Sequence, residues 1–218
     1  GHGDYKLLVY APASVQESVD LTMLAFDKAD EYRNPALLLS DASIAQMMEP
    51  VELPAMRDVD FDKPWAMRGK HGGPNKRVSS TMYYIEDFDA YIKAKYDTMI
   101  AKEQRWENVC VEDADVVLVA YGISSRICKE AVAMARAKGI RLGLLRPISL
   151  WPFPVDGFSE VNPAVKGYFT VELSALPRLQ EDVLLATGQR VPVHYFLGGM
   201  NIPEPSAIIE KAVKLIAE

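Results

Sequence analysis

The chain has 218 residues, 49% of them hydrophobic, which is enough for one large domain or two small ones with a sizeable core. The net charge of −6 argues against nucleic acid and against an anionic membrane surface as partners. The apolar runs are too short to cross a bilayer and the first residues carry no signal-peptide pattern, so we expect a cytoplasmic protein that does not enter a membrane.

The first segment alternates between strand-like and helix-like patterns. Residues 6–11 form an apolar run, which predicts a strand. Ser14 and Glu17 have the spacing of a capping box, in which each side chain accepts a hydrogen bond from a backbone N–H group at a helix start. The helix is expected to continue to about Arg33, because Pro35 then interrupts the pattern.

One apolar stripe is expected to bury this helix against the sheet. It consists of Val19, Met23, Phe26 and Ala29. A second strand over 36–39 and a short helix over 44–48 complete a βαβ unit. Residues 1–53 are therefore interpreted as part of a parallel α/β domain.

Residues 54–112 are interpreted as a linker that contains one amphipathic helix. The stretch to residue 80 is rich in proline, glycine and scattered charge, without a helical or strand period. Its basic side chains leave two interpretations open, a solvated connection or a contact with an anionic ligand such as a CoA phosphate. These side chains are Arg68, Lys70, His71, Lys76 and Arg77. Apolar and aromatic residues at three- and four-residue steps then predict a helix over 85–106 that packs in the core or at an interface.

Residues 113–218 predict a complete α/β domain. Strands at 116–120 and 142–148 flank a helix, and such a unit implies parallel strands joined by a right-handed crossover. Ser124 and Ser125 are predicted to cap that helix, although free N–H groups at such a helix start also bind anions. The remaining pattern predicts helices over 156–161, 176–186 and 207–217, and strands over 167–173 and 191–197.

The chemistry-bearing side chains are few. Cys110 and Cys128 are expected to be buried thiols rather than a disulfide, and they are too few for an iron–sulfur cluster, which takes about four thiolates. His194 lies in a predicted strand and is expected to pack there. There is no Walker loop, no Gly-x-Ser-x-Gly nucleophile elbow and no metal-ligand spacing. No residue is therefore assigned as a catalytic group or a metal ligand.

Two words of sequence in the second half carry a family resemblance. They are Ala-Tyr-Gly-Ile-Ser-Ser-Arg at 120–126 and Ala-Lys-Gly-Ile-Arg-Leu-Gly-Leu-Leu-Arg-Pro-Ile-Ser-Leu-Trp-Pro-Phe-Pro at 137–154. Both resemble the alpha chain of 2-oxoacid:ferredoxin oxidoreductases. In that family, the corresponding domain is similar to the last domain of transketolases.

Further words are similar to the later part of the same family's thiamine-pyrimidine domain. They are Gly-His-Gly-Asp-Tyr at 1–5, Ala-Pro-Ala-Ser-Val-Gln-Glu at 11–17, Leu-Ser-Asp at 39–41 and Gln-Met-Met-Glu-Pro at 46–50. The resemblance implies an α/β fold with a partial thiamine-pyrimidine-type parallel sheet domain at 1–53. A complete transketolase-C-terminal-like parallel α/β domain follows at 113–218. It also implies the C-terminal part of an alpha subunit, and we interpret the chain as a fragment.

The resemblance implies a thiamine-diphosphate-dependent enzyme that oxidatively decarboxylates a 2-oxo acid, forms an acyl-CoA and reduces ferredoxin. In the complete enzyme we expect the diphosphate and Mg²⁺ on a beta subunit and iron–sulfur clusters on partner chains, with gamma or delta subunits left open. This chain alone is expected to be inactive and to bind no cofactor tightly. A branched-chain 2-oxo acid such as 2-oxoisovalerate is favoured over 2-oxoglutarate as the substrate, and a non-catalytic scaffold module of such a complex is the alternative.

Seven residues are candidates for a cofactor cleft or an interface. They are His2, Asp4, Asp41, Gln46, Glu49, Ser124 and Ser125. Asp41 follows the carboxyl end of a predicted strand, where open α/β sheets bind ligands. Turn and cap roles explain Asp41, Gln46 and Glu49 equally well, and the place of His2 and Asp4 near an active site is implied by the resemblance alone.

One position departs from the family pattern. After the strand at 167–173, relatives have an Asn and then a Gly-Gln pair, whereas this chain has Pro177 and Arg178. The contact that the Gly-Gln pair makes in relatives, at a subunit face, is therefore in doubt here.

Overall fold

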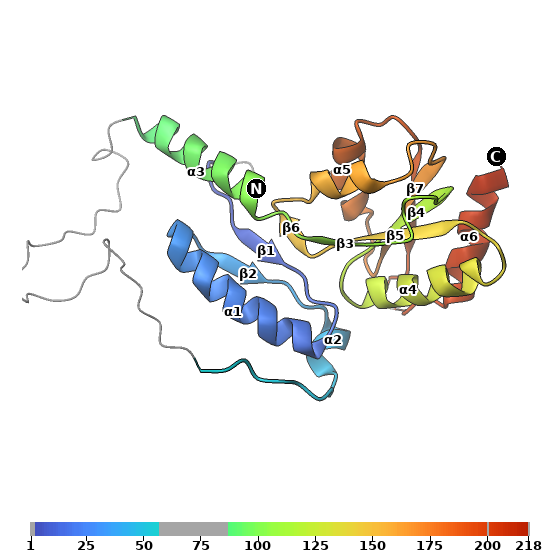
Figure 1. The fold of residues 1–218 in the computed structure, drawn as a ribbon, viewed down its shortest axis with the longest axis horizontal. Helices are drawn as coiled ribbons and strands as arrows, with labels where there is room; N and C mark the ends of the chain where they lie inside the picture. Colours follow the sequence, from blue (N-terminus) through green and yellow to red (C-terminus); the bar gives the residue numbers. More distant parts are fainter. Residues whose placement is uncertain (1–2, 57–86, 200, 218) are drawn as a thin grey trace, which may run out of the picture.

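A computed structural model describes residues 3–56, 87–199 and 201–217 of the chain. Two neighbouring β-sheets with helices packed on them form the fold (Figure 1). Within the described residues, no helix is long and apolar enough to span a membrane.

The first part of the chain supplies β1 (Leu8–Tyr10), α1 (Val15–Tyr32), β2 (Ala36–Leu38) and α2 (Ala42–Gln46). After residue 86 come α3 (Phe88–Lys102), β3 (Trp106–Val109), β4 (Val116–Val119), α4 (Gly122–Arg136), β5 (Leu142–Pro147) and β6 (Ser149–Trp151). The last part supplies the 3₁₀ helix η2 (Val155–Glu160), β7 (Gly167–Glu172), α5 (Arg178–Thr187), β8 (Val193–Leu197) and α6 (Pro205–Ala217). The smaller sheet has the order β2-β1-β6 and the larger sheet the order β3-β5-β4-β7-β8.

The larger sheet has a parallel centre with helices on both faces. β4 pairs in parallel with β5 and β7, β8 pairs with β7, and only β3 runs antiparallel, next to β5. Because successive side chains point to opposite faces of a strand, Val116 and Leu118 pack with α4 and α6, while Val117 and Val119 pack with α5 (Figure 1). All four side chains are fully buried, as expected for a sheet covered on both sides.

The smaller sheet depends on residues from both halves of the chain. β1 pairs in parallel with β2 and antiparallel with β6. Leu8 and Tyr10 are fully buried in a core that includes side chains of α1 and α3. Only Ile148 separates β5 from β6, so the chain passes from the larger sheet to the smaller one within one residue.

The face of α1 that packs on the small sheet differs from the prediction. Leu21 and Leu24 join the core with Leu8, whereas Met23 and Phe26 are exposed. The helix has two opposite apolar faces, and the face predicted to pack on the sheet is the one that points outward. Periodicity shows that a helix has an apolar face, but here it did not show which of two faces meets the sheet.

The helix predicted over 85–106 ends earlier than expected. α3 stops at Lys102, and Trp106 begins β3, where it lies opposite Pro147 of β5. Short strands of mixed composition such as β3 and β6 take their conformation from the strands that they pair with, so neither was predicted. The basic group of the linker, between 68 and 77, lies outside the described residues.

Two expectations about burial are corrected. Both cysteines are free and Cys128 is buried, but Cys110 is exposed. Cys110 follows directly after β3 with a positive φ of 52°, in a turn rather than in the sheet. His194 is exposed because β8 is the outermost strand of the larger sheet.

Candidate functional site

A cavity of about 270 Å³ lies where the two sheets meet, at the carboxyl ends of β2, β4 and β7. Its lining combines apolar, hydroxyl and charged side chains. They are Leu39, Ser40, Asp41, Tyr121, Ile123, Ser124, Val171, Glu172, Leu173, Ser174 and Arg178. Open parallel sheets bind ligands at this edge, so the cavity is the candidate site of the described chain.

Asp41 connects the two sheets with a single carboxylate. Its Oδ1 accepts a hydrogen bond of 2.9 Å from the backbone N–H of Ile44, which caps α2. Its Oδ2 accepts one of 2.7 Å from the backbone N–H of Ile123 in the first turn of α4. Tyr121, the residue before α4, provides no side-chain cap of its own. The side chain of Asp41 therefore caps two helices, one beside each sheet.

Gly122 makes this contact sterically possible. Its φ of +58° is strained for a residue with a side chain, and a Cβ atom at this position would lie 2.4 Å from Oδ2 of Asp41. The carboxylate of Asp41 thus occupies the space that a side chain would need, and glycine is required at the start of α4.

Glu49 forms a second connection to α4. Its Oε1 lies 2.7 Å from Nη1 of Arg126, and its Oε2 accepts a hydrogen bond of 3.1 Å from the backbone N–H of Val15. The hydrogen bond from Arg126, and then the one from Val15, holds the pKa of Glu49 below its ordinary value. Asp41 and Glu49 therefore both cap helix starts and both connect the part of the chain around the smaller sheet to α4, which packs on the larger sheet.

Glu172 lines the far side of the cavity. Its buried Oε1 accepts a hydrogen bond of 3.0 Å from the backbone N–H of Leu179, at the start of α5, where Pro177 provides no side-chain cap. Burial raises the pKa of Glu172 despite this hydrogen bond. The pKa of Tyr121 is also raised, by burial first and then by the charge of Glu172.

The two candidate serines have different roles from those predicted. Both lie inside α4 rather than at its N-cap, which is Tyr121. Ser124 is buried and lines the cavity. Ser125 is fully buried and its hydroxyl donates a hydrogen bond of 2.7 Å to the carbonyl of Gly122, which makes it part of the helix interior.

The other candidates are not gathered at the cavity. Asp4 is exposed and precedes β1, so it lies at the amino-end edge of the small sheet, opposite Asp41. Gln46 is exposed at the end of α2, and His2 lies outside the described residues. Of the predicted set, Asp41 and Ser124 line the cavity, and Glu49 lies beside the same helix as Ser124.

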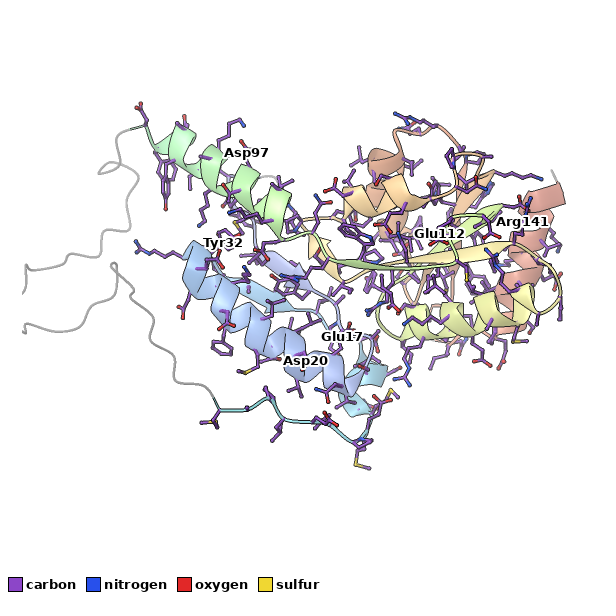
Figure 2. The ribbon with its side chains drawn as sticks, in the orientation of Figure 1. Glu17, Asp20, Tyr32, Asp97, Glu112 and Arg141 are labelled. Carbon is purple, nitrogen blue, oxygen red and sulfur yellow. The ribbon has the colours of Figure 1, made fainter. Side chains whose placement is uncertain are left out.

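An ion network that links α1, β3, β5 and α4 was not predicted. Arg146 of β5 is only 5% exposed and binds Glu17 of α1 through two contacts of 2.7 Å. Its Nε contacts Glu107 of β3 at 2.8 Å, and Glu107 also binds Lys129 of α4 at 2.7 Å. Figure 2 shows Glu17 near the end of α1 that faces the larger sheet. The capping-box spacing pointed to Glu17, but its partner is 129 residues away in the sequence.

Glu17 itself keeps only half of the predicted capping box. Ser14 accepts a hydrogen bond of 3.0 Å from the N–H of Glu17, as expected, but the Glu17 carboxylate accepts from Ala13 rather than from Ser14. Burial acts to raise the pKa of Glu17, and the hydrogen bonds from Arg146 and Ala13 outweigh it, so its pKa lies below the ordinary value.

The described residues contain no cluster of metal-ligating side chains. Across 3–56, 87–199 and 201–217, no group of three or more His, Cys, Asp or Glu side chains is placed to hold a metal ion.

Comparison with known families decides the relationship. The family described as "Pyruvate flavodoxin/ferredoxin oxidoreductase, thiamine diP-bdg" matches residues 2–113, and "Pyruvate:ferredoxin oxidoreductase core domain II" matches residues 114–206. The chain belongs to the pyruvate:ferredoxin oxidoreductase family. The resemblance drawn from the sequence is thereby confirmed.

Curated relatives match all or nearly all of the chain. Ketoisovalerate oxidoreductase subunit VorB of Methanothermobacter marburgensis is 43% identical, covering 100% of this chain and 63% of that protein. 2-Oxoglutarate synthase subunit KorA of the same organism is 28% identical, covering 96% of this chain and 64% of that protein. The chain thus spans less than two thirds of the length of these relatives.

A solved structure with the same fold also matches nearly the whole chain. It is 2-oxoglutarate:ferredoxin oxidoreductase from Magnetococcus marinus, with 2-oxoglutarate, coenzyme A and succinyl-CoA bound. The TM-score is 0.77 at 20% identity, and the match covers 99% of this chain and 43% of that one. The predicted fold class is confirmed, with the antiparallel strands β3 and β6 added to it.

Proposed function

We propose that the chain is part of the alpha subunit of a thiamine-diphosphate-dependent 2-oxoacid:ferredoxin oxidoreductase. The enzyme takes a 2-oxo acid, coenzyme A and two oxidised ferredoxins, and produces an acyl-CoA, CO₂, two reduced ferredoxins and a proton. The observation that carries the proposal is the 43% identity to a ketoisovalerate oxidoreductase subunit along the whole chain. Coverage of this kind leaves no segment of the chain without a counterpart in that subunit.

We favour a branched-chain 2-oxo acid, such as 2-oxoisovalerate, as the substrate. Identity to the ketoisovalerate subunits is 43% and 42%, against 28% to 30% for the 2-oxoglutarate subunits. 2-Oxoglutarate is the second candidate, because several 2-oxoglutarate synthase subunits match more than nine tenths of the chain.

In this proposal the described residues orient the assembly rather than carry out the chemistry. Thiamine diphosphate supplies carbanion stabilisation, and Mg²⁺ and the iron–sulfur clusters belong to partner chains. Asp41, Glu49 and the Glu17–Arg146 pair hold the smaller sheet and the larger sheet, each with its helices, at a fixed relative position. Isothermal titration with thiamine diphosphate and Mg²⁺ is expected to show no tight binding to this chain alone, and a sub-micromolar site would contradict that expectation.

The activity is tested on the full-length subunit that contains this chain, purified anaerobically with its partner subunits. Viologen reduction is followed with thiamine diphosphate, Mg²⁺ and coenzyme A, and with a panel of 2-oxo acids. The highest kcat/KM is expected with 2-oxoisovalerate. The highest value with 2-oxoglutarate would select the second candidate, and an assembled complex that reduces nothing with any acid would overturn the enzymatic proposal in favour of a scaffold.

A further inference from the structure

The cavity where the two sheets meet has a buried polar group that the fold itself does not use. Ser124 is only 4% exposed and lines the cavity, yet its hydroxyl forms no hydrogen bond with any other described residue. The neighbouring Ser125 differs, because its hydroxyl donates to the carbonyl of Gly122. Buried hydroxyls are nearly always paired, so an unpaired one in a cavity wall indicates an occupant that accepts or donates the missing hydrogen bond.

Two further donors lie in the same wall. They are the guanidinium of Arg178 and the hydroxyl of Tyr121. Neither forms a side-chain hydrogen bond or a salt bridge within the described part of the chain. Four other arginines of this half of the chain each have a carboxylate oxygen at 2.7 Å. These are Arg126, Arg136, Arg141 and Arg146. Arg178 is therefore an uncommitted cation beside two uncommitted hydroxyl groups.

The two carboxylates of the cavity wall are already engaged. Both oxygens of Asp41 accept backbone N–H groups, and so does Oε1 of Glu172. The N–H groups at the starts of α4 and α5 carry partial positive charge, which offsets the negative charge of these two side chains. Arg178 and Glu172 interact through space, but no salt bridge joins them among the described residues. The guanidinium is thus free to bind an anionic group.

The size and the remaining walls of the cavity limit what that anionic group belongs to. The volume of about 270 Å³ is just below the roughly 300–1,000 Å³ of pockets for drug-sized ligands, which favours a small molecule over a nucleotide or a coenzyme. Apolar side chains form much of the wall, and they favour an occupant with a hydrocarbon body over inorganic phosphate. They are Leu39, Ile123, Val171 and Leu173. A planar guanidinium matches the two oxygens of a carboxylate.

We propose that this cavity binds a small monocarboxylate with an apolar body. Arg178 binds the carboxylate, the hydroxyls of Ser124 and Tyr121 donate hydrogen bonds to it, and the apolar walls contact the hydrocarbon part. The proposed function assigns no ligand to this cavity, so the inference does not rest on it. A branched-chain oxo acid and a branched-chain amino acid share the required chemistry, and separate probes distinguish them.

The test titrates the full-length subunit with isovalerate and measures the Kd by calorimetry. Arg178→Gln removes the cation and is expected to weaken binding by at least about tenfold, as for the loss of a charge-assisted hydrogen bond. Arg190→Gln is the matched control, because Arg190 is also exposed but lies outside this cavity, and it is expected to bind like the unmodified subunit. Ser124→Ala is expected to weaken binding by about threefold and to leave the Tm of the free subunit unchanged, since its hydroxyl has no partner to lose.

Further probes separate the two parts of the ligand. 3-Methylbutanol has the same hydrocarbon body without the carboxylate, and acetate has the carboxylate with one methyl group. Each is expected to bind at least about tenfold more weakly than isovalerate. 2-Oxoisovalerate and valine then compare an oxo acid with an amino acid. Only binding that Arg178→Gln weakens is assigned to the cavity, and the tighter of the two identifies the group that the cavity accepts beside the carboxylate.

Three results would overturn the proposal. The first is that none of the acids binds. The second is equal binding to the unmodified subunit, Arg178→Gln and Ser124→Ala, which would place the ligand elsewhere. The third is equal affinity for 3-methylbutanol and isovalerate, which would show that no carboxylate is recognised. The readout is binding, so Arg178-dependent binding in a complex that oxidises no 2-oxo acid supports this inference while refuting the proposed activity.

Discussion

Oδ2 of Asp41 lies 2.7 Å from the backbone nitrogen of Ile123 and accepts its hydrogen bond across the junction of the two sheets. The other oxygen of the same carboxylate caps α2. A residue with one acceptor atom can replace one of these contacts but not both. Holding α4 and α2 together at this point therefore requires a side chain with two acceptor oxygens, which a carboxylate provides and a hydroxyl or amide does not.

Two substitutions at Asp41 measure the stabilisation from each of its two helix caps separately. Asp41→Asn keeps one acceptor oxygen and is expected to lower the free energy of unfolding by about 1 kcal/mol, while Asp41→Ala loses both caps and is expected to cost about 2 kcal/mol. Urea titration followed by circular dichroism measures both, with Gln46→Ala as an exposed control on α2. Equal losses for the Asn and Ala variants would show that only one of the two caps stabilises the fold.

A methyl group at Gly122 is expected to destabilise the protein more than one at Gly139. Both glycines have a positive φ, +58° and +76°, so each Ala variant pays a conformational cost of about 1 kcal/mol or more. Only at Gly122 does the new Cβ also meet Asp41, at 2.4 Å, whereas nothing lies within 4 Å at Gly139.

The Gly122→Ala/Asp41→Ala double variant tests the origin of the difference. Removal of the Asp41 carboxylate removes the steric conflict, so the double variant is expected to be more stable than the sum of the two single losses predicts. Strict additivity in the thermal unfolding free energies would mean that the strain at Gly122 has another source.

Loss of Arg146 is expected to be costly because it leaves two carboxylates without their shared cation. Arg146→Met removes the contacts to Glu17 and Glu107 and is expected to lower the free energy of unfolding by about 3 kcal/mol, the lower end of the range for a buried pair, because Glu17 keeps some exposure. Chemical denaturation at neutral pH measures the loss. A cost below that of an exposed-pair variant such as Lys214→Met would contradict the assigned role.

The same pair has a defined pH dependence. Because the pKa of Glu17 is lowered on folding, its ionised form stabilises the fold above the unfolded pKa, and this contribution disappears as the pH falls through the folded pKa. The stability difference between the unmodified chain and Glu17→Gln is expected to shrink as the pH falls from about 6 to about 3. A difference that stays constant across this range would show that the charge of Glu17 is not what stabilises the junction.

The pH dependence of stability that Glu172 contributes runs in the opposite direction to that of Glu17. Its pKa is raised by burial, so stability is greatest below the unfolded pKa and decreases as the pH rises towards the folded pKa. Glu172→Gln keeps an oxygen for the N–H of Leu179 and removes the buried charge, so it is expected to match or exceed the unmodified chain in stability at pH 7. Glu172→Ala loses the cap and is expected to be less stable. Equal destabilisation by both variants would show that the negative charge is needed.

The parts of the fold that were predicted are those in which local pattern and tertiary environment agree. β4 and β5 are apolar runs buried on both faces, and such runs specify a central parallel strand without knowledge of the neighbours. β3 and β6 were missed, because each is a short antiparallel strand whose conformation comes from its partner. The choice between the two apolar faces of α1 also required the position of the sheet.

The candidate site was predicted in part for the same reason. The carboxyl-end rule led to Asp41, which lies three residues after the end of β2 and lines the cavity. The cap at Ile123 and the steric role of Gly122 could not be predicted, since they depend on how the second sheet is placed against the first. Arg178 was noticed as a departure from relatives, and the structure places it at the cavity without explaining the substitution.

The passage from β5 to β6 through Ile148 has a consequence for how this polypeptide acquires its structure. Val9 of β1 pairs with Trp151 of β6, so β1 completes its pairing only with residues from the second half of the chain. Contacts of such long sequence separation slow folding, because most of the chain must be ordered before they form. Until residues 149–151 have been synthesised, β1 therefore has β2 as a partner but lacks β6. The smaller unit is expected to become protease-resistant only after the larger one has been synthesised.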